Sequence, residues 1–447
     1  MRRVILVSID WTRDKDPRVP LGHASLVAAL RSAGRETRAF SFAINRNDFD
    51  EELVLRSMIE HVQELDSEQV DVGIGVYVWN DDVVKRLLPR LRRQGFQGRI
   101  ILGGPQISYA GSGLERLYPE ADAFIRGYAE EALVALTATT ERIQLEGIHW
   151  AGQLDRSLQS RTRLETLASP FLTGVIELSS GQRFIRWETQ RGCPFRCSFC
   201  QHREAGNRLR RRDIPLARLE REMESFVRSG VDDIAVLDPL FNLGDHALAV
   251  LRTLRRLGYR GRLSLQCHFS TLDDEFLDAC DGLDVRLEFG LQTIHEREAR
   301  AVERVNDMEK VRRGMLKLHA RRIPFEVSVI FGLPEQTLHS FQETIDFCLR
   351  SGVPTLKAFP LMLLRGTALE RDRARWGLVE NEEPIPSVIR SHTFDEHDWM
   401  RMTELADALR RTEGRHPGSV EALAKWVVVA PDTRGRWSPV ADLVAEG

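Results

Sequence analysis

Short apolar segments alternate with amphipathic helical segments along most of this chain of 447 residues, and the alternation runs in two separate series. Apolar strands that are separated by helices of about 10–15 residues indicate right-handed crossovers and a parallel sheet. At about 150 residues per domain, a chain of this length is expected to form two or three domains. The alternation therefore predicts an α/β protein with two parallel sheets.

The first series, in residues 1–135, predicts a doubly wound parallel sheet of the Rossmann type, which binds ligands at the carboxyl ends of its strands. The expected strands are Val4–Ile9, Thr37–Phe42, Val72–Val78, Arg99–Leu102 and Ala123–Ile125. The expected helices are His23–Ala33, Phe49–Glu64 and Asp82–Gln94. Residues 136–182 are polar and weakly periodic, and we expect a linker that includes one hairpin.

The second series, in residues 183–365, predicts six βα units that form a partial (β/α)6 barrel with its site at the carboxyl-terminal face. The expected strands are Phe184–Gln190, Asp233–Leu237, Leu263–His268, Val285–Leu291, Phe325–Phe331 and Leu356–Pro360. The expected helices are Pro215–Ser229, Asp245–Leu257, Asp273–Cys280, Met308–Arg321 and Leu338–Ser351. Residues 366–447 are expected to form a small helical extension.

Composition excludes several classes of protein. Lys and Arg number 63 and Asp and Glu number 66, so a net charge of −3 gives no reason to expect binding to nucleic acid or to an anionic membrane. No stretch approaches the roughly 18 apolar residues of a membrane-spanning helix. The apolar run Val4–Ile9 is too short for a signal peptide, and we expect a cytoplasmic protein.

Three of the six cysteines fall within eight positions, directly after the first expected strand of the barrel. Cys193, Cys197 and Cys200 have the spacing Cys-x3-Cys-x2-Cys, which lets three thiolates hold three corners of a [4Fe–4S] cluster and leaves the fourth iron open. One alternative is a zinc site, for which His202 or Cys267 would supply the fourth ligand. The other is a chance grouping of buried thiols.

This loop resembles the cysteine motif of the radical S-adenosylmethionine (SAM) superfamily, and the resemblance extends through the barrel. It implies that SAM binds the open iron and is cleaved by one electron to methionine and a 5′-deoxyadenosyl radical, which abstracts hydrogen from a substrate. The electron would come from an external one-electron donor such as flavodoxin.

The same resemblance implies a set of SAM-binding residues at the strand ends. Each of them could instead cap a helix or, in the case of Phe199, fill an apolar space. Four of them are implied near the adenine of SAM: Phe199, Gly332, Leu333 and Pro334. Asp238 and Asn242 are implied near its amino group, and Glu288 and Gln292 near its ribose and carboxylate.

The loops of the first series resemble those of the cobalamin-binding domain that is fused to many radical SAM enzymes. These loops are Pro20-Leu21-Gly22, Tyr77-Val78-Trp79-Asn80, Gly103-Gly104-Pro105 and Gly127-Tyr128-Ala129-Glu130-Glu131. The chain departs from the better-known cobalamin motif, because Asp10 is followed by Trp11 and Thr12 and no histidine ligand to cobalt is predicted. The alternative is a domain that keeps the fold and supports the barrel without cobalamin.

In size and layout the chain resembles the radical diol dehydratases that deoxygenate aminoglycoside antibiotics. This resemblance implies hydrogen abstraction from a small, polar, sugar-like intermediate and loss of water as a lyase reaction, followed by reduction of a carbonyl by a partner reductase that uses a nicotinamide. The candidates for acid–base catalysis at the strand ends are Asp238, His268, Glu288 and Lys357.

Two other functions stay open from the sequence. A cobalamin-dependent radical SAM C-methyltransferase would use both domains and would add a methyl group to its substrate. A non-catalytic iron–sulfur or zinc protein would hold a metal centre that does not respond to SAM.

Overall fold

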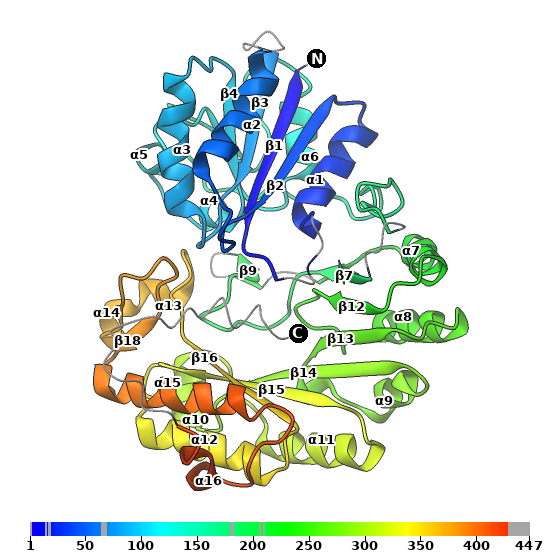
Figure 1. The fold of residues 1–447 in the computed structure, drawn as a ribbon, viewed down its shortest axis with the longest axis vertical. Helices are drawn as coiled ribbons and strands as arrows, with labels where there is room; N and C mark the ends of the chain where they lie inside the picture. Colours follow the sequence, from blue (N-terminus) through cyan, green and yellow to red (C-terminus); the bar gives the residue numbers. More distant parts are fainter. Residues whose placement is uncertain are drawn as a thin grey trace. The chain divides into compact units, whose positions relative to one another are not determined.

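The computed structural model describes residues 2–13, 16, 19–63, 69–178, 183–204, 207–208 and 211–427. The described chain divides into two compact units. One unit comprises residues 2–185 with 224–230, and the other comprises residues 186–223 with 231–427. Each unit contains its own six-stranded sheet (Figure 1).

The first unit contains a sheet with the strand order β2-β1-β3-β4-β5-β6, in which the first five strands are parallel. The strands are β1 Arg3–Asp10, β2 Thr37–Ala43, β3 Val70–Gly75, β4 Arg99–Gly103, β5 Ala123–Ile125 and β6 Ile148–Trp150. The helices are α1 Leu21–Ser32, α2 Glu51–Gln63, α3 Asp81–Arg93, α4 Pro105–Ser108, α5 Leu114–Leu117 and α6 Glu130–Leu136. This order confirms the predicted doubly wound sheet.

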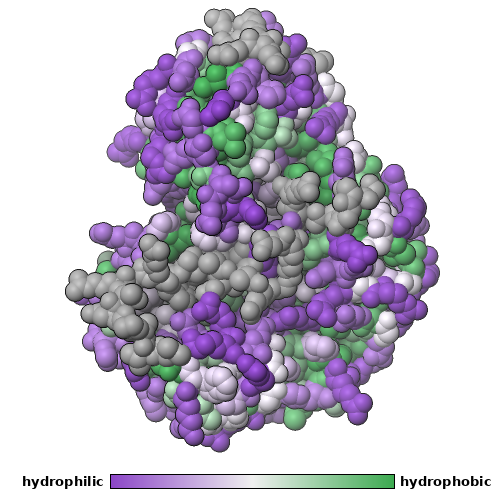
Figure 2. All heavy atoms as spheres, viewed as in Figure 1, coloured by the Kyte–Doolittle hydropathy of each residue, from purple (hydrophilic) through white to green (hydrophobic). Residues whose placement is uncertain are grey.

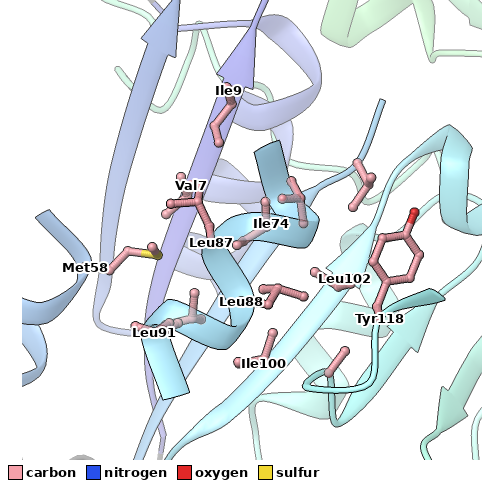
Figure 3. Close-up of a cluster of buried hydrophobic side chains, with 14 of the residues drawn as sticks. Val7, Ile9, Met58, Ile74, Leu87, Leu88, Leu91, Ile100, Leu102 and Tyr118 are labelled. Atoms are coloured by element: carbon pink, nitrogen blue, oxygen red, sulfur yellow. The ribbon is translucent and has the colours of Figure 1, made fainter. Parts of the chain in front are cut away.

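Alternating residues of β1 belong to two hydrophobic cores, one on each face of this sheet. Ile5, Val7 and Ile9 pack in a core with α2 and α3, part of which is drawn in Figure 3. Val4 and Leu6 pack in a second core with α1 and α6. Because both faces are covered, five of the six residues from Val4 to Ile9 are apolar, which explains why they appear in the sequence as one short apolar run.

The hairpin expected in residues 136–182 is wrong for the described part of that segment. β6 pairs antiparallel with β5 instead, with Trp150 opposite Ala123 and Ile148 opposite Ile125. The Trp150 ring is buried in the core that α1 and α6 share. A strand of three residues is stabilised more by extending an existing sheet and burying a tryptophan than by pairing in a local hairpin. Three residues are also too few to show a strand period in the sequence.

The second six-stranded sheet, whose strands β12 to β16 lie in the second unit, has the strand order β16-β15-β14-β13-β12-β7. The strands are β7 Phe184–Trp187, β12 Asp233–Val236, β13 Arg262–Cys267, β14 Asp284–Gln292, β15 Phe325–Phe331 and β16 Thr355–Pro360. The main helices are α7 Leu216–Arg228, α8 Asp245–Arg256, α9 Asp274–Cys280, α10 Glu296–Ala301, α11 Met308–Arg321 and α12 Leu338–Arg350. The parallel pairing from β12 to β16 confirms the predicted βα series.

The region after the barrel contains a small sheet as well as the helices expected there. Its helices are α13 Ala368–Arg371, α14 Arg373–Trp376, α15 Glu396–Arg411 and α16 Val420–Ala424. Strands β17 Val379–Glu380 and β18 Val388–Arg390 pair antiparallel, which the sequence analysis did not predict. The part of the predicted extension after residue 427 lies outside the described residues.

In the strands of the second unit, buried apolar side chains alternate with partly buried side chains on the opposite face of the sheet. Along β14, Val285, Leu287, Phe289 and Leu291 are buried, whereas the intervening Arg286, Glu288, Gly290 and Gln292 are only partly buried. The apolar set faces the helices, so the intervening set lines the inner face of the sheet. Strand β13 repeats this pattern, with Ser264 and Gln266 on the inner face.

Hydrophilic side chains cover most of the visible surface that the structure describes, with smaller hydrophobic areas between them (Figure 2). Among the described residues, we find no helix whose length and apolar character would let it cross a membrane.

Candidate functional site

The three-cysteine loop follows β8 Gln190–Arg191, which pairs antiparallel with β11 Arg212–Asp213. Gly192, with φ +93°, turns the chain into the loop. Cys193, Cys197 and Cys200 all carry free thiols, and the amide of Cys200 donates to the carbonyl of Cys197 at 3.2 Å. The loop is therefore a compact turn that brings three sulfur ligands together.

The three thiols influence one another electrostatically. Burial raises the pKa of Cys200, and together with the neighbouring thiols of Cys197 and Cys193 it brings this pKa to about 11. Burial also raises the pKa of Cys193, and Cys197 adds to this effect. Without metal these cysteines hold their protons, and they lose them when the sulfur atoms bind iron. The three thiols can therefore serve as ligands of a cluster, and binding of the cluster would release protons.

The alternative zinc site has no support in the geometry of the described residues. Those residues include no group of three or more His, Cys, Asp or Glu side chains placed to hold one metal ion. The thiolates of a [4Fe–4S] cluster bind different irons and need not converge on one point. Cys267 lies on the helix-covered face of β13, where burial and the nearby Cys280 raise its pKa well above the usual value.

Phe195, inside the cysteine loop, links the loop to two side chains from other elements. Its ring stacks on His268 with the ring centres 4.4 Å apart, and the guanidinium carbon of Arg304 lies 5.5 Å from the ring centre. Arg304 also donates through Nη1 to the sulfur of Cys197, at 3.6 Å. The sequence analysis missed both Phe195 and Arg304, because no spacing rule links position 304 to the loop.

His268 is a neutral imidazole in this environment. Burial, together with the charges of Arg304 and Lys310, lowers its pKa to about 3. Nδ1 accepts the amide of Ser270 at 3.0 Å, so the ring proton lies on Nε2. As a proton acceptor His268 is therefore weak, and its ring chiefly supports Phe195.

Asp238 and Asn242 hold backbone segments in place around the loop. The carboxylate of Asp238 is fully buried and accepts hydrogen bonds from the amides of Thr189, at 2.8 Å, and Gln190, at 3.2 Å, and from the hydroxyl of Thr189. The side chain of Asn242 accepts from the amide of His268 at 2.8 Å and donates to its carbonyl at 3.0 Å. Both residues lie where they were predicted, but their polar atoms bind protein.

Glu288 and Lys357 lie within a polar network on the inner face of the sheet. Lys357 Nζ lies 3.1 Å from Glu326 Oε2, and Arg286 Nη2 lies 2.8 Å from the same oxygen. Burial and the charge of Glu326 raise the pKa of Glu288, which accepts a hydrogen bond from Gln266. Arg286, Glu326 and Gln266 were missed, although all three occupy inner positions that the two-residue period of the strands marks.

Gln292 combines a strained backbone with an unused acceptor. Its φ is +68°, and its pairing with β15 follows a bulge after Gly290. A Cβ atom at Gly290 would lie 2.5 Å from Gln292 Nε2, so glycine makes room for this side chain. Within the described chain, the buried Oε1 of Gln292 has no hydrogen-bond partner. A polar ligand at this strand end, as SAM was expected to be, would satisfy it.

The loop Gly332-Leu333-Pro334 follows β15 and is held by Gln336. Oε1 of Gln336 accepts the amides of Gly332 at 2.7 Å and Leu333 at 3.2 Å, and the Leu333 side chain is fully buried. Phe199 is half-buried in the cysteine loop. The adenine contacts predicted for these four residues stay predictions.

In the first unit, polar groups collect at the carboxyl ends of the strands. Nδ2 of the buried Asn80 donates to the carbonyls of Ile9, at 2.8 Å, and Gly75, at 3.0 Å, which joins the ends of β1 and β3. Tyr77 and Trp79 stack with ring centres 4.6 Å apart. A Cβ atom at Gly104, where φ is +90°, would lie 2.7 Å from the backbone of Val76.

Two buried nitrogen atoms at this edge have no hydrogen-bond partner in the described chain. They are Nε1 of Trp11, directly after β1, and Nε2 of His23, near the start of α1. Burial lowers the pKa of His23 to about 4, so its ring is neutral. Buried donors and acceptors without protein partners fit a polar ligand, and the amide-bearing corrin of cobalamin is one.

Comparison with known proteins finds a family match within the second sheet and its helices. Residues 187–348 match the model of the radical SAM superfamily. The chain is 24% identical over 330 residues to the cobalamin-dependent radical SAM methyltransferase TokK of Streptomyces tokunonensis, covering 68% of this chain and 48% of that protein. It is 26% identical over 336 residues to the 2-(S-pantetheinyl)-carbapenam-3-carboxylate methyltransferase of Streptantibioticus cattleyicolor, with the same coverage. The chain spans about half the length of these relatives.

Among solved structures, the chain is similar to the radical SAM methyltransferase TsrM of Kitasatospora setae with cobalamin and a [4Fe–4S] cluster bound. The TM-score is 0.68 at 19% identity, and the match covers 90% of this chain and 82% of that one. At this identity, the match shows a shared fold across both units.

Proposed function

We propose that this chain, which carries a radical SAM domain, is a cobalamin-dependent radical SAM methyltransferase that acts on a small molecule. The domain confirms the [4Fe–4S] cluster and SAM as cofactors. One observation carries the proposal of methyl transfer: over 90% of its length, this chain has a fold similar to that of a methyltransferase whose structure contains cobalamin.

Methyl transfer was the alternative in the sequence analysis, where dehydration came first. The compared relatives are named as methyltransferases, and this supports the alternative over loss of water. With dehydration set aside, the partner reductase that would reduce its carbonyl product is no longer needed. An external one-electron donor of the flavodoxin type stays part of the proposal.

In this function, the residues of the chain bind and position the cofactors. Cys193, Cys197 and Cys200 would hold three irons and leave the fourth to SAM, which would supply the radical, while bound cobalamin would carry the methyl group. Gln292 Oε1 would accept a hydrogen bond from SAM. The unpartnered nitrogens of Trp11 and His23 would serve polar groups of the corrin.

The proposal is tested without knowledge of the substrate. The chain is purified without oxygen after expression with hydroxocobalamin, and corrinoid absorption and cobalt per chain are measured. It is then reduced in the presence of SAM, and S-adenosylhomocysteine and 5′-deoxyadenosine are quantified separately. We expect about one cobalt per chain and formation of S-adenosylhomocysteine, the product left when SAM donates a methyl group.

A chain that binds no corrinoid and forms no S-adenosylhomocysteine would contradict methyl transfer. Formation of 5′-deoxyadenosine alone would leave a radical SAM enzyme of another reaction class, with dehydration as the next candidate. A matched variant, Cys267→Ala, removes a buried thiol outside the loop and should behave as the wild type.

A further inference from the structure

Arg304 places a positive charge against the cysteine loop at several points. Its Nη1 lies 3.6 Å from the sulfur of Cys197, and its guanidinium carbon lies 5.5 Å from the centre of the Phe195 ring. One side chain therefore contacts both a sulfur ligand and an aromatic ring of the loop.

The backbone fixes this side chain in place. The carbonyl of Val302, directly after α10, accepts the amide of Ser198 at 3.0 Å, so this turn docks on the cysteine loop. Glu303 has φ +52°, and the amide of Arg304 donates to Ala299 at 2.8 Å. Nη2 of Arg304 donates to the carbonyl of Gly290 at 2.5 Å.

The charge of Arg304 is poorly screened. Within the described residues, its buried Nε has no hydrogen-bond partner, and its terminal nitrogens donate to a sulfur and a carbonyl. Charges that are partly removed from water interact more strongly with their neighbours than exposed charges do. A charge at this site therefore affects the cluster more than the charge of an exposed arginine would.

We propose that Arg304 is a positioning residue that raises the reduction potential of the [4Fe–4S] cluster. The cluster gains one electron on reduction, taken from dithionite in the experiment below, and its net charge falls by one. A fixed cation and an N–H···S hydrogen bond stabilise the reduced form more than the oxidised form. This inference rests on Cys193, Cys197 and Cys200 as the cluster ligands and does not depend on methyl transfer.

The experiment is a redox titration of the full chain, reconstituted with iron and sulfide, in the absence of SAM. Iron and sulfide per chain establish cluster loading, and electron paramagnetic resonance of the reduced cluster gives the midpoint potential. For Arg304→Met we expect at least a tenfold smaller equilibrium constant for reduction, which corresponds to a midpoint about 59 mV more negative. Arg304→Lys, which keeps the charge, should remain within about threefold of the wild type.

Arg300→Met is the matched control, since Arg300 lies on α10 with an exposed side chain that pairs with Glu296. Its midpoint should equal that of the wild type. A wild-type midpoint potential in cluster-loaded Arg304→Met would overturn the proposal. If that variant then bound SAM more weakly than the wild type, Arg304 would act on SAM binding and not on the cluster potential. If Arg304→Met does not load, Arg304→Gln is titrated, and failure of both uncharged variants to load would make the role structural and also overturn the proposal.

Discussion

Asp238 is a carboxyl group whose surroundings oppose its ionisation. It is fully buried, and burial raises its pKa from 3.8 to about 7, although hydrogen bonds from Thr189 and Gln190 act in the opposite direction. Between these two values, the folded chain holds a proton that the unfolded chain has released. Stability from this group is therefore fully present below about pH 4 and is lost as the pH rises through about 7.

Asp238→Asn is expected to remove this part of the pH dependence, because the amide does not titrate. Urea unfolding of the cluster-free chain at several values between pH 4 and pH 8 measures the effect. The matched control is Glu224→Gln, which changes an exposed carboxylate on α7 and should keep the wild-type profile. An identical profile in Asp238→Asn and the wild type would show that Asp238 does not cause it.

Gly104 shows the opposite case, in which backbone geometry alone determines the residue. Gly104→Ala is expected to destabilise the first unit by about 1–3 kcal/mol through its backbone conformation, and the contact of Cβ with Val76 adds to this cost. Gly111→Ala is the control, since no atom lies within 4 Å of its Cβ position. Thermal and urea unfolding of both variants tests this, and equal stability of the two would refute the expectation.

At the residue scale, the sequence predicted part of the candidate site. The cysteines, Gln292 and Glu288 were found because motif spacing and strand ends mark them. Arg304 was not, since its place depends on a left-handed Glu303 and on a hydrogen bond between two distant loops. Contacts of this kind arise only after the elements have packed.

At the scale of elements, Asn80 joins β1 and β3 at the edge where ligands bind. Asn80→Asp has nearly the same shape but loses the donor to Ile9 and Gly75, so two buried carbonyls lose a partner. We expect a cost of about 1–3 kcal/mol and faster hydrogen exchange in both strands. Asn45→Asp, which loses a similar bond to Thr12 at an exposed position, should cost less. Equal exchange in the two variants would argue against this role.

The sequence predicted many of these elements to within a few residues, because each buried strand is a short apolar run and each helix that covers a sheet has a clear period. It missed β6 and the β17–β18 pair, which have only two or three residues per strand. It also ran the first barrel strand through to Gln190, whereas the structure ends β7 at Trp187 and starts β8 at Gln190. Whether such short strands form depends on the strands with which they pair, and two or three residues are too few to predict a strand from the sequence.

At the scale of the whole molecule, we expect iron and cobalt to load independently, since the three cysteines lie in the second unit and the residues proposed to serve the corrin lie in the first. Replacing Cys193, Cys197 and Cys200 together by alanine should remove the roughly four irons per chain of the cluster and leave cobalt binding unchanged. Replacing Cys267 and Cys280 by alanine controls for loss of buried thiols and should keep the iron. Metal analysis of both proteins after reconstitution decides, and full iron content in the triple variant would refute the assignment of ligands.

The alternation along β14 and its neighbours has a practical consequence for protein engineering. Inner positions such as 264 and 328 can be randomised in a library while the apolar layer beneath them stays untouched. Most members of such a library should still fold. Selection would then act mainly on which molecules the barrel binds, and seldom on restoring stability.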